Sequence, residues 1–331
     1  LNGVAIEELL TIPMAVEAVE QAYLEKSKGD AALWPMVFHE FDPGHADLDI
    51  KSGDLGGLGF YGLKVVSWFG ANPGKGLPAL YGTSLLFDLA TGAPRALLNA
   101  GPITDFRTGA AGAIGAKYLA RPDAETLLMA GTGALAPYLI AATLYLLPQI
   151  KTVYVTNPHH PECSAAACEA ITPQVEKLLS GCGGCHAAIA AAPDLEKAVR
   201  HSDVILTATP AREPFIKAEW VQPGTHISCV GADMSGKQEV DSALFASAKV
   251  FGDDTAQCLS VGECEVPYKA GVFSGHICEI GGVISGAEAG RTDASDITIF
   301  DSTGIALQDI ATAAALLQAA QETGKGQTVT L

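Results

Sequence analysis

Positive charge is scarce in this chain of 331 residues. It has 20 Lys and Arg against 37 Asp and Glu, which gives a formal net charge of −17 at pH 7. Proteins that bind nucleic acids or anionic membranes neutralise phosphates with clustered Lys and Arg. The deficit of basic residues therefore argues against DNA, RNA and membrane surfaces as partners.

The chain also lacks a long hydrophobic run. Its longest apolar stretch lies near residues 139–150 and contains Pro148, whereas a membrane-spanning helix needs about 20 apolar residues. The first residues lead into an acidic segment without a basic start or an apolar core, so nothing in them indicates an export signal. We expect no transmembrane span and a cytoplasmic location.

Cysteine, by contrast, occurs eight times, so disulfides, metal ligands and ordinary thiols all have to be considered. A chain of this length does not need disulfides to build a core. Cys182, Cys185 and His186 have the spacing of a haem attachment sequence or of half a zinc site. Haem attachment goes with export, and a zinc site would need a second pair of ligands. We therefore expect reduced thiols here and no bound metal.

The composition that remains is that of a globular α/β enzyme. Hydrophobic residues make up 48% of the chain and charged residues 17%, which is typical of a folded protein rather than a disordered one. The length allows two domains, each with its own core. We expect residues 1–120 to form one domain, to which the tail 302–331 returns, and residues 121–301 to form the other.

The first of these domains has a mixed helix and strand pattern. Residues 14–28 carry apolar side chains at helical spacing and predict an amphipathic helix. From residue 34 to about residue 99, short alternating runs separated by turn residues predict a sheet of hairpins. The alanine-rich segment 108–119 predicts a second helix, which ends at the turn 121–123. This domain is therefore of the α+β type.

Strands and helices alternate after Pro122, as a parallel doubly wound sheet requires. The predicted strands are residues 126–130, 152–156, 188–192, 204–208, 226–230 and 250–252. Six is the number of strands in a complete dinucleotide-binding sheet of the Rossmann type. A further strand at 297–300 and a long alanine-rich helix from about 305 to 321 follow.

A glycine turn links the first of these strands to an apolar helix. It reads Gly131-Thr132-Gly133-Ala134-Leu135-Ala136. Such a turn lets the pyrophosphate of a dinucleotide approach the backbone, and the helix N-terminus offers free N–H groups to it. A bare glycine turn is weak evidence, but its position between strand and helix is the one that a nicotinamide dinucleotide site requires.

The end of the second strand bears on the choice between NAD and NADP. NAD-selective sites usually carry Asp or Glu there to hold the ribose 2′-hydroxyl, whereas this chain has Asn157, Pro158, His159 and His160. No carboxylate would repel a 2′-phosphate, and Asn157, His159 and His160 are candidate donors. NADP is therefore the cofactor that we favour, although the two histidines are also compatible with a solvated turn.

Three charged residues are candidates for substrate binding or catalysis. Lys64 and Arg107 lie among apolar neighbours, where a cation needs an anionic partner. A substrate carboxylate could be that partner, gripped by paired N–H groups of Arg107 with Lys64 as a point charge; structural salt bridges are the alternative. Asp233 follows the fifth strand, and ligands bind outside the carboxyl ends of such strands. It is either a carboxylate that faces the cofactor or a turn residue.

These residues belong to an ordered set of motifs. The set comprises Gly62–Val66, Leu86–Asp88 with Thr91 and Gly92, Ile103–Ala111, the Gly131 turn, Ala208–Pro210, Pro223–His226, Gly231–Asp233 with Lys237 and Glu239, and Ile297–Ala306 with Asp309. In this order the motifs resemble those of the ornithine cyclodeaminase and mu-crystallin family, from about Gly59 to the C-terminus.

The resemblance implies a homodimer whose Rossmann domain is joined to a domain for substrate binding and dimerisation. It implies that Lys64 and Arg107 hold the substrate carboxylate and that Asp233 is the acid/base beside the amino or imino group. With the resemblance, the predicted cofactor site comprises Thr108, Gly131, Thr132, Gly133, Ala134, Leu135, Asn157, His159, Ala208, Thr209, Pro210, Val230, Gly231, Ser302 and Thr303.

Two positions depart from the family pattern. Met36 stands where many members have an Arg after a proline, so one expected carboxylate contact is missing. Lys51, Ser52 and Gly53 stand where many members have Met-Pro. Lys51 is therefore a candidate replacement cation for the substrate, with simple exposure as the alternative.

Members of the family interconvert amino acids with imino or keto acids by hydride transfer. We therefore expect an NAD(P)-dependent oxidoreductase that acts on a small amino or imino acid, as a ketimine reductase or an amino acid dehydrogenase. An ornithine cyclodeaminase, which returns the hydride and releases proline and ammonia, is the alternative reaction. A non-catalytic NADP(H)-binding protein like mu-crystallin is the alternative of another class, disfavoured by the joint presence of Lys64, Arg107 and Asp233.

Overall fold

The computed structural model describes residues 1–182 and 187–329. Contacts divide the chain into two compact units, which we name unit 1 (Leu1–Arg107 with Ile305–Leu331) and unit 2 (Thr108–Gly304). Helix α3 (Ala100–Leu119) contains the boundary and contributes residues to both. Cys185 and His186, two members of the candidate haem or zinc segment, lie outside the described residues.

Unit 1 contains an antiparallel six-stranded sheet, as the hairpin pattern between residues 34 and 99 predicted. Its strands are β1 (Ala31–Leu33), β2 (Val37–Asp42), β3 (Ala46–Leu55), β4 (Phe60–Phe69), β5 (Leu80–Asp88) and β6 (Pro94–Asn99). They run in the order β1-β3-β4-β5-β6, and β2 also pairs with β3. The β5–β6 turn forms because the Asp88 carboxylate accepts hydrogen bonds from the backbone of Ala90 and Thr91.

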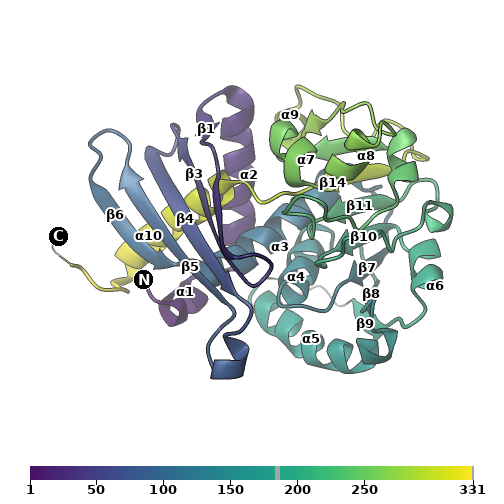
Figure 1. Ribbon diagram of the computed structural model, residues 1–331, viewed down its shortest axis with the longest axis horizontal. Coiled ribbons are helices and arrows are strands. Elements are labelled where there is room, and N and C mark those ends of the chain that lie inside the picture. Colours follow the sequence, from purple (N-terminus) through teal and green to yellow (C-terminus); the bar gives the residue numbers. More distant parts are fainter. Residues whose placement is uncertain (183–186, 330–331) are drawn as a thin grey trace. The chain divides into compact units, whose positions relative to one another are not determined.

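The helices of unit 1 are α1 (Gly3–Leu9), α2 (Ile12–Lys28) and α10 (Ala306–Thr323). Helix α2 begins where Thr11 Oγ1 accepts a hydrogen bond from Met14 N, and it ends at Gly29 in the left-handed conformation. Helix α10 lies across one face of the sheet (Figure 1). Gly53 on β3 favours this approach, because a Cβ there would lie 3.1 Å from Leu307 Cδ2 of α10.

The opposite face of the sheet is apolar. Strand register places Leu63 opposite Leu85 and Val65 opposite Ile50, and these side chains point away from Gly62 and Lys64. Large side chains of unit 1 remain exposed: Val37 by 53%, Phe41 by 55%, Tyr81 by 49% and Leu97 by 60%. An exposed apolar face of this kind is typical of a surface that another protein covers.

Unit 2 is built on a parallel eight-stranded sheet in the order β13-β12-β14-β11-β10-β7-β8-β9. Its strands are β7 (Thr126–Ala130), β8 (Thr152–Thr156), β9 (Ala188–Ala191), β10 (Val204–Thr207), β11 (His226–Cys229), β12 (Lys249–Gly252), β13 (Cys278–Glu279) and β14 (Thr298–Asp301). Its other helices are α4 (Ala136–Leu146), α5 (Ser164–Leu179), α6 (Leu195–Arg200), α7 (Thr255–Val261), α8 (Glu265–Lys269) and α9 (Ile280–Ser285). This is the predicted α/β fold with a doubly wound sheet of the Rossmann type.

The predicted strands of unit 2 are all present, each within one residue at either end. Their order was not predicted in full: β14, the last strand along the chain, lies between β11 and β12 and pairs with both. The two-residue strand β13 adds an eighth member at the edge. Short 3₁₀ turns occur at Pro161–Cys163, Ala218–Trp220 and Ser242–Ala246 of unit 2 and at Pro73–Lys75 of unit 1.

Helix α3 corrects one expectation. It begins at Ala100 rather than near Thr108, so Arg107 lies within the helix and not at its start. The earlier start is possible because Pro102 falls in the first turn, where its missing N–H costs nothing. Asn99 supports that turn, since its side-chain oxygen accepts a hydrogen bond from Gly101 N at 2.9 Å.

Candidate functional site

Two buried cations of unit 1 share one carboxylate oxygen. Lys64 on β4, Arg107 on α3 and Asp309 in the first turn of α10 are exposed by only 3%, 6% and 2%. Asp309 Oδ1 lies 3.0 Å from Lys64 Nζ and 3.2 Å from Arg107 Nε. Its other oxygen, Oδ2, accepts no hydrogen bond from the described residues. One carboxylate therefore faces two cations and balances the charge of only one of them.

Neutral side chains complete this group, which we name the cation cluster. Arg107 Nη1 donates to Gln308 Oε1 at 3.0 Å, and Gln308 Nε2 donates to the hydroxyl of Tyr23 at 2.8 Å. Lys64 Nζ lies 3.4 Å from Thr104 Oγ1. These contacts fix the two cations from helices α2, α3 and α10, so both are held in place before any ligand arrives.

Lys51 belongs on the same face of the sheet. It stands directly opposite Lys64 in the β3–β4 register, so both side chains leave the sheet on the side that α10 covers. Burial, then the charges of Arg107 and Lys51, lower the pKa of Lys64 to about 8, although Asp309 opposes this. Opposed like charges are unfavourable unless an anion joins them. The arrangement suits a negatively charged ligand.

The cation cluster changes the pKa of two nearby carboxyl groups, Asp309 and Asp105. Burial alone would raise the pKa of Asp309, but the charges of Arg107 and Lys64 hold it below its usual value. Asp105, on the same helix as Arg107, has a pKa raised to about 6 by burial, an effect that Arg107 only partly offsets. Asp309 is therefore the permanent counter-ion of the cluster.

The glycine turn of unit 2 has the shape that a dinucleotide requires. Gly131 adopts a φ of 127°, and a Cβ there would lie 2.5 Å from the carbonyl oxygen of Ala208. Around Gly133, no other group lies within 4 Å of the position that a Cβ would take. Thr132, Ala134 and Leu135 complete the turn and lead into α4. The turn leaves open space in front of a helix N-terminus, which fits a pyrophosphate.

Thr108 is close to this turn through helix packing. A Cβ on Gly109 would lie 2.7 Å from backbone atoms of Tyr138 on α4, so the two helices are in backbone contact there. Thr108 is 5% exposed, and its hydroxyl has no hydrogen-bond partner among the described residues. A buried hydroxyl with unused capacity, next to the helix that follows the glycine turn, is a candidate ligand for the cofactor.

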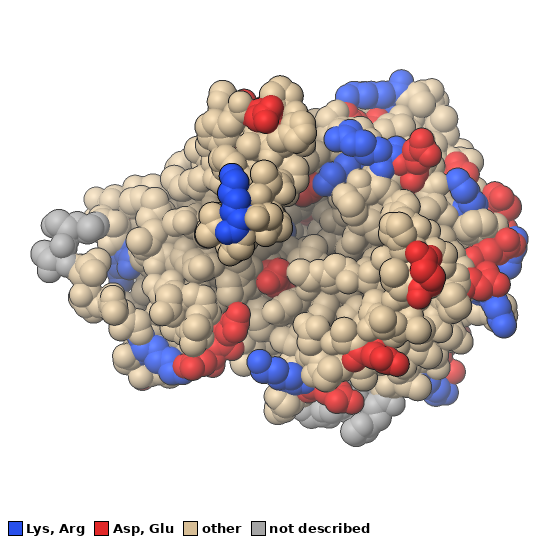
Figure 2. All heavy atoms as spheres, turned by 60° about the horizontal axis from the view of Figure 1, so that its bottom comes forward, with Lys and Arg blue, Asp and Glu red and all other residues tan. Residues whose placement is uncertain are grey.

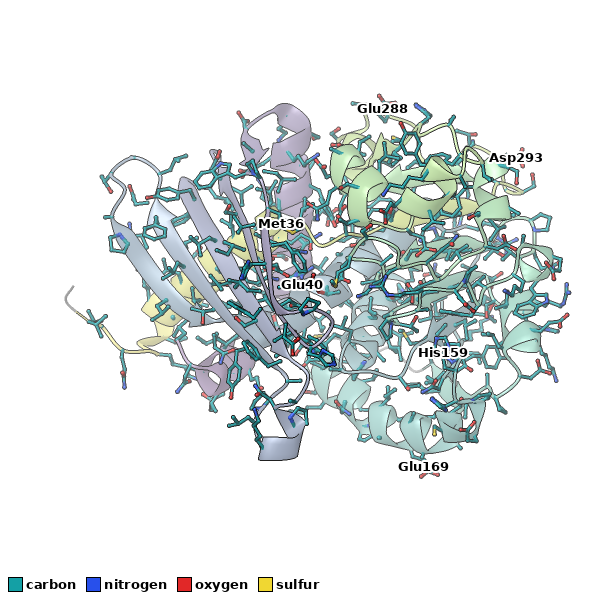
Figure 3. The ribbon with its side chains drawn as sticks, viewed as in Figure 1. Met36, Glu40, His159, Glu169, Glu288 and Asp293 are labelled. Carbon is teal, nitrogen blue, oxygen red and sulfur yellow. The ribbon has the colours of Figure 1, made fainter. Side chains whose placement is uncertain are left out.

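Asn157 shapes the turn after β8 and joins it to the glycine turn. Its Nδ2 donates to Thr132 Oγ1 at 3.1 Å, and its Oδ1 accepts from the backbone N–H groups of His159 and His160. His159, labelled in Figure 3, packs against Phe215 in a T-shaped arrangement with ring centroids 5.7 Å apart. The sequence offered Asn157 as a donor to a 2′-phosphate, whereas its amide is engaged within the protein.

The remaining predicted cofactor residues lie at the carboxyl ends of three neighbouring strands. Ala208, Thr209 and Pro210 follow β10; Val230 and Gly231 follow β11; Ser302 and Thr303 follow β14. Thr303 Oγ1 donates to Asp253 Oδ1 at 2.7 Å, and Ser302 N donates to Cys229 O at 2.9 Å. These loops therefore lie side by side at the carboxyl ends of the strands, where Rossmann proteins bind their ligands.

Asp233 lies in the loop that follows β11, with half of its side chain exposed. Its Oδ1 is 2.5 Å from Lys237 Nζ, an i,i+4 ion pair. Glu265, which is 1% exposed, holds the same loop by accepting hydrogen bonds from Ser235 Oγ at 2.5 Å and Gly236 N at 2.7 Å. The loop thus presents Asp233 at its surface on a fixed backbone.

Two of these residues, Asp309 and Gln308, had no predicted role. They carry polar side chains in an otherwise apolar segment, which is the signal that a sequence offers for a buried polar group. Met36 precedes β2 and is 39% exposed (Figure 3), so it adds an apolar surface rather than a cation. The cation cluster itself comes from β4, α2, α3 and α10, and Lys51 on β3 lies opposite Lys64.

Two features are absent from the described residues. No three His, Cys, Asp or Glu side chains of residues 1–182 and 187–329 are grouped to hold a metal ion. None of the helices in these ranges is both long and apolar enough to cross a membrane. On the face shown in Figure 2, Lys and Arg lie in small groups with Asp and Glu between them.

Comparison with known proteins agrees with this geometry. The profile of the ornithine cyclodeaminase/mu-crystallin family matches residues 1–324. The chain belongs to this family. An alanine dehydrogenase of Archaeoglobus fulgidus is 36% identical over 312 residues, which cover 93% of this chain and 90% of the relative.

Solved structures of family members have the same fold. An archaeal alanine dehydrogenase dimer with bound NAD superimposes with a TM-score of 0.86 at 35% identity, covering 100% of this chain and 98% of that one. The Δ1-pyrroline-2-carboxylate reductase of Thermococcus litoralis, solved with NADH and L-proline, gives a TM-score of 0.87 at 31% identity and 99% coverage of both chains. Both structures hold a nicotinamide dinucleotide, as predicted for this fold.

Proposed function

We propose that this protein is an NAD(P)-dependent oxidoreductase that interconverts a small amino acid and its imino or keto acid. One observation carries the proposal: two buried cations, Lys64 and Arg107, share a single carboxylate oxygen of Asp309. A pair of cations with one counter-ion suits a substrate carboxylate. Family members that act as an alanine dehydrogenase and as a pyrroline-2-carboxylate reductase support the same substrate class.

In this proposal the cation cluster binds and orients the substrate. Arg107 donates to the carboxylate through its planar guanidinium, and Lys64 adds a point charge. Lys51, opposite Lys64 in the register, is the third cation and takes the place of the arginine that Met36 replaces. Because helices α2, α3 and α10 already hold Lys64 and Arg107, little conformational freedom is lost on binding.

The cofactor site in unit 2 supports NAD(P) as the redox partner. Gly131 and Gly133 leave room for the pyrophosphate at the start of α4. Bound nicotinamide supplies hydride transfer to and from the substrate Cα. Asp233 exchanges the proton at the substrate nitrogen, because acid/base catalysis needs a positioned group that can reach solvent. Lys237 holds the Asp233 carboxylate in place for that exchange.

NADP(H) is the cofactor that we favour. Asn157 stands where an NAD-selective protein has a carboxylate, so no negative charge at this residue opposes a 2′-phosphate. The two solved relatives hold NAD and NADH, and the site has the turn that both cofactors require. The preference therefore rests on the missing carboxylate rather than on new donors.

We further propose that the partner of this chain is a second copy of itself. The apolar face of the unit 1 sheet exposes Val37, Phe41, Tyr81 and Leu97, and the archaeal alanine dehydrogenase is a dimer. Isologous contact between two such faces would bury these side chains.

The cysteines of the described residues are free thiols, which agrees with a reducing, cytoplasmic compartment.

The test is NAD(P)H oxidation followed by absorbance across cyclic and acyclic 2-imino acids, with ornithine cyclisation assayed in parallel. Net oxidation with a pyrroline or with a keto acid plus ammonia supports the reductase or dehydrogenase. Ammonia release from ornithine without net cofactor change would instead make the protein a cyclodeaminase. Tight cofactor binding without turnover of any substrate would make it a binding protein.

The variant Asp233→Asn tests the acid/base assignment. Turnover should be lost while NAD(P)H binding stays close to that of the unaltered protein, because Asn keeps the size of the side chain but takes up no proton. Asp241→Asn is the matched control: Asp241 caps a turn in unit 2 by accepting from Ala243 N, which Asn can also do. Full turnover in Asp233→Asn would remove Asp233 from this role.

A further inference from the structure

One buried glutamate binds the loops after β10 and β11 to each other. Glu239 is completely buried. Its Oε2 accepts from Thr207 Oγ1 at 2.6 Å and from Gly231 N at 3.0 Å, and its Oε1 accepts from Thr209 N and Thr209 Oγ1, both at 2.7 Å. Oε1 thus accepts only from the loop after β10, whereas Oε2 accepts from both β10 and the loop after β11. A carboxylate can accept all four hydrogen bonds without offering a competing donor.

The loops around the Glu239 carboxylate are packed so closely that two of their neighbouring glycines have no room for a side chain. A Cβ on Gly231 would lie 2.6 Å from Glu239 Oε1 and 2.3 Å from the carbonyl oxygen of Thr209. Gly131 of the glycine turn meets the same loop, since its Cβ would lie 2.5 Å from Ala208 O. The loop after β10 is therefore in contact with the glycine turn on one side and with Gly231 on the other, and Glu239 lies at the second contact.

A second glutamate holds the backbone of the first. Glu263 is also completely buried, and its Oε1 accepts from Glu239 N at 2.8 Å and from Val240 N at 2.6 Å. Burial and the charge of Glu239 raise the pKa of Glu263 well above its usual value. Burial also raises the pKa of Glu239, whereas its hydrogen bonds from Thr207, Thr209 and Gly231 lower it, so these donors favour the carboxylate form of Glu239.

The two loops belong to the half of the sheet that binds the nicotinamide mononucleotide. A Rossmann sheet has two mononucleotide-binding halves, and the glycine turn after β7 serves the adenosine half and the pyrophosphate. The strands β10 and β11 belong to the other half. We propose that Glu239 is a positioning residue for the nicotinamide half of the cofactor, which it serves by fixing Thr209 and Gly231 in one arrangement.

This inference rests on the proposed cofactor site, and its test separates the two. Titration of the full-length protein with NADH, NADPH, ADP and 2′,5′-ADP would measure Kd for the whole cofactor and for its adenosine half. For Glu239→Gln we expect the Kd of the preferred reduced cofactor to rise on the order of 10-fold or more, because the amide NH₂ faces a donor. The Kd of the matching adenosine fragment should change less than about twofold.

A spectroscopic readout adds a signal that a general loss of stability would not move. Bound NAD(P)H fluoresces according to the surroundings of its nicotinamide ring, so the emission at saturation should shift toward that of free cofactor in Glu239→Gln. The inference would be overturned if Glu239→Gln raised the Kd of the whole cofactor and of the adenosine fragment equally, or raised neither. Absence of binding by the unaltered protein would instead overturn the proposed function.

Thr207→Val provides a milder variant if Glu239→Gln fails to fold. Thr207 is fully buried in β10 and loses only the hydroxyl that donates to Glu239. Thr143→Val is the matched control, because Thr143 is equally buried and its hydroxyl has no partner among the described residues. Thr207→Val should raise the Kd of the whole cofactor about threefold or more relative to Thr143→Val. Equal Kd values in the two variants would contradict the role of Glu239.

Discussion

Lys64 and Asp309 form an ion pair across unit 1, with 3.0 Å between Nζ and Oδ1 and 3% of each side chain exposed. Removing one partner of such a pair leaves an uncompensated charge, which costs about 3–5 kcal/mol. Arg107 Nε approaches the same oxygen at 3.2 Å, so Asp309 cannot neutralise both cations. The residual positive charge is what would bind a substrate carboxylate.

This charge should make activity depend on pH. The folded pKa of Lys64 is about 8, lowered by burial and then by Arg107, so Lys64 is protonated below that pH and loses its charge above it. We expect kcat/KM to fall as pH rises through about 8, because the neutral amine no longer attracts the substrate carboxylate. The profile of kcat/KM from about pH 6 to 10 measures this.

Lys64→Arg separates Lys64 from other titrating groups. Arginine stays protonated at every pH in that range, so the fall near pH 8 should disappear even if the absolute activity drops. Arg95→Lys is a control of similar chemistry, since Arg95 pairs with Asp88 at a partly exposed position away from Lys64. A break near pH 8 that persists in Lys64→Arg would assign it to a different group.

The two glycines of the turn after β7 should respond differently to alanine. Gly131→Ala places a Cβ 2.5 Å from Ala208 O at a φ of 127°, and such strain lowers the free energy of unfolding by about 1–3 kcal/mol. Gly133→Ala meets no neighbour within 4 Å and should leave the melting temperature unchanged. Its methyl group would occupy the space needed by the pyrophosphate and raise the Kd for NAD(P)H about 10-fold.

Thermal unfolding and cofactor titration of both variants would check this pair of outcomes. Each variant serves as the other's control, because the substitution is the same and the two residues are separated only by Thr132. Equal loss of stability in both would contradict the geometry of the turn. Unaltered cofactor affinity in Gly133→Ala would contradict the pyrophosphate site.

Much of the fold was predictable because local signals mark it. The run Thr126–Ala130 is short, apolar and followed by glycine, and β14 is a short strand with Ile299 and Phe300 at its centre. The order of the strands in the sheet could not be predicted, because hydrophobic periodicity does not indicate which strands pair. Strand β14 enters the middle of the sheet between β11 and β12, an arrangement that only tertiary contacts determine.

The candidate site was predictable as residue types but not as partnerships. Lys64 and Arg107 attract attention as cations in apolar segments, yet their partner Asp309 is 245 residues from Lys64 along the chain. Glu239 gives even less signal, because a single glutamate after a glycine loop is common on a surface. Its burial follows from loops that fold back over it, which no local pattern encodes.

The cofactor preference should shift with one charge at the end of β8. In Asn157→Asp the carboxylate keeps the acceptor that binds His159 N and His160 N, so the turn should persist. The new negative charge would repel the 2′-phosphate and raise the KM for NADPH on the order of 10-fold, with little effect on NADH. Gln174→Glu, the same change of charge on exposed helix α5, is the control. An unchanged ratio of the two KM values would contradict a 2′-phosphate site beside Asn157.

The sheet of unit 1 should tolerate no charge on its apolar face if two copies meet there. Leu97 on β6 stands opposite Leu85 in the register and is 60% exposed, so Leu97→Glu adds a carboxylate to a surface that a dimer would bury. Burying an unpaired charge costs several kcal/mol, and the variant should elute as a monomer where the unaltered protein is a dimer. Val4→Glu on α1, at a residue exposed by 67%, should leave the dimer intact. Light scattering on size-exclusion fractions would measure both masses, and a dimer that survives Leu97→Glu would place the contact on another surface.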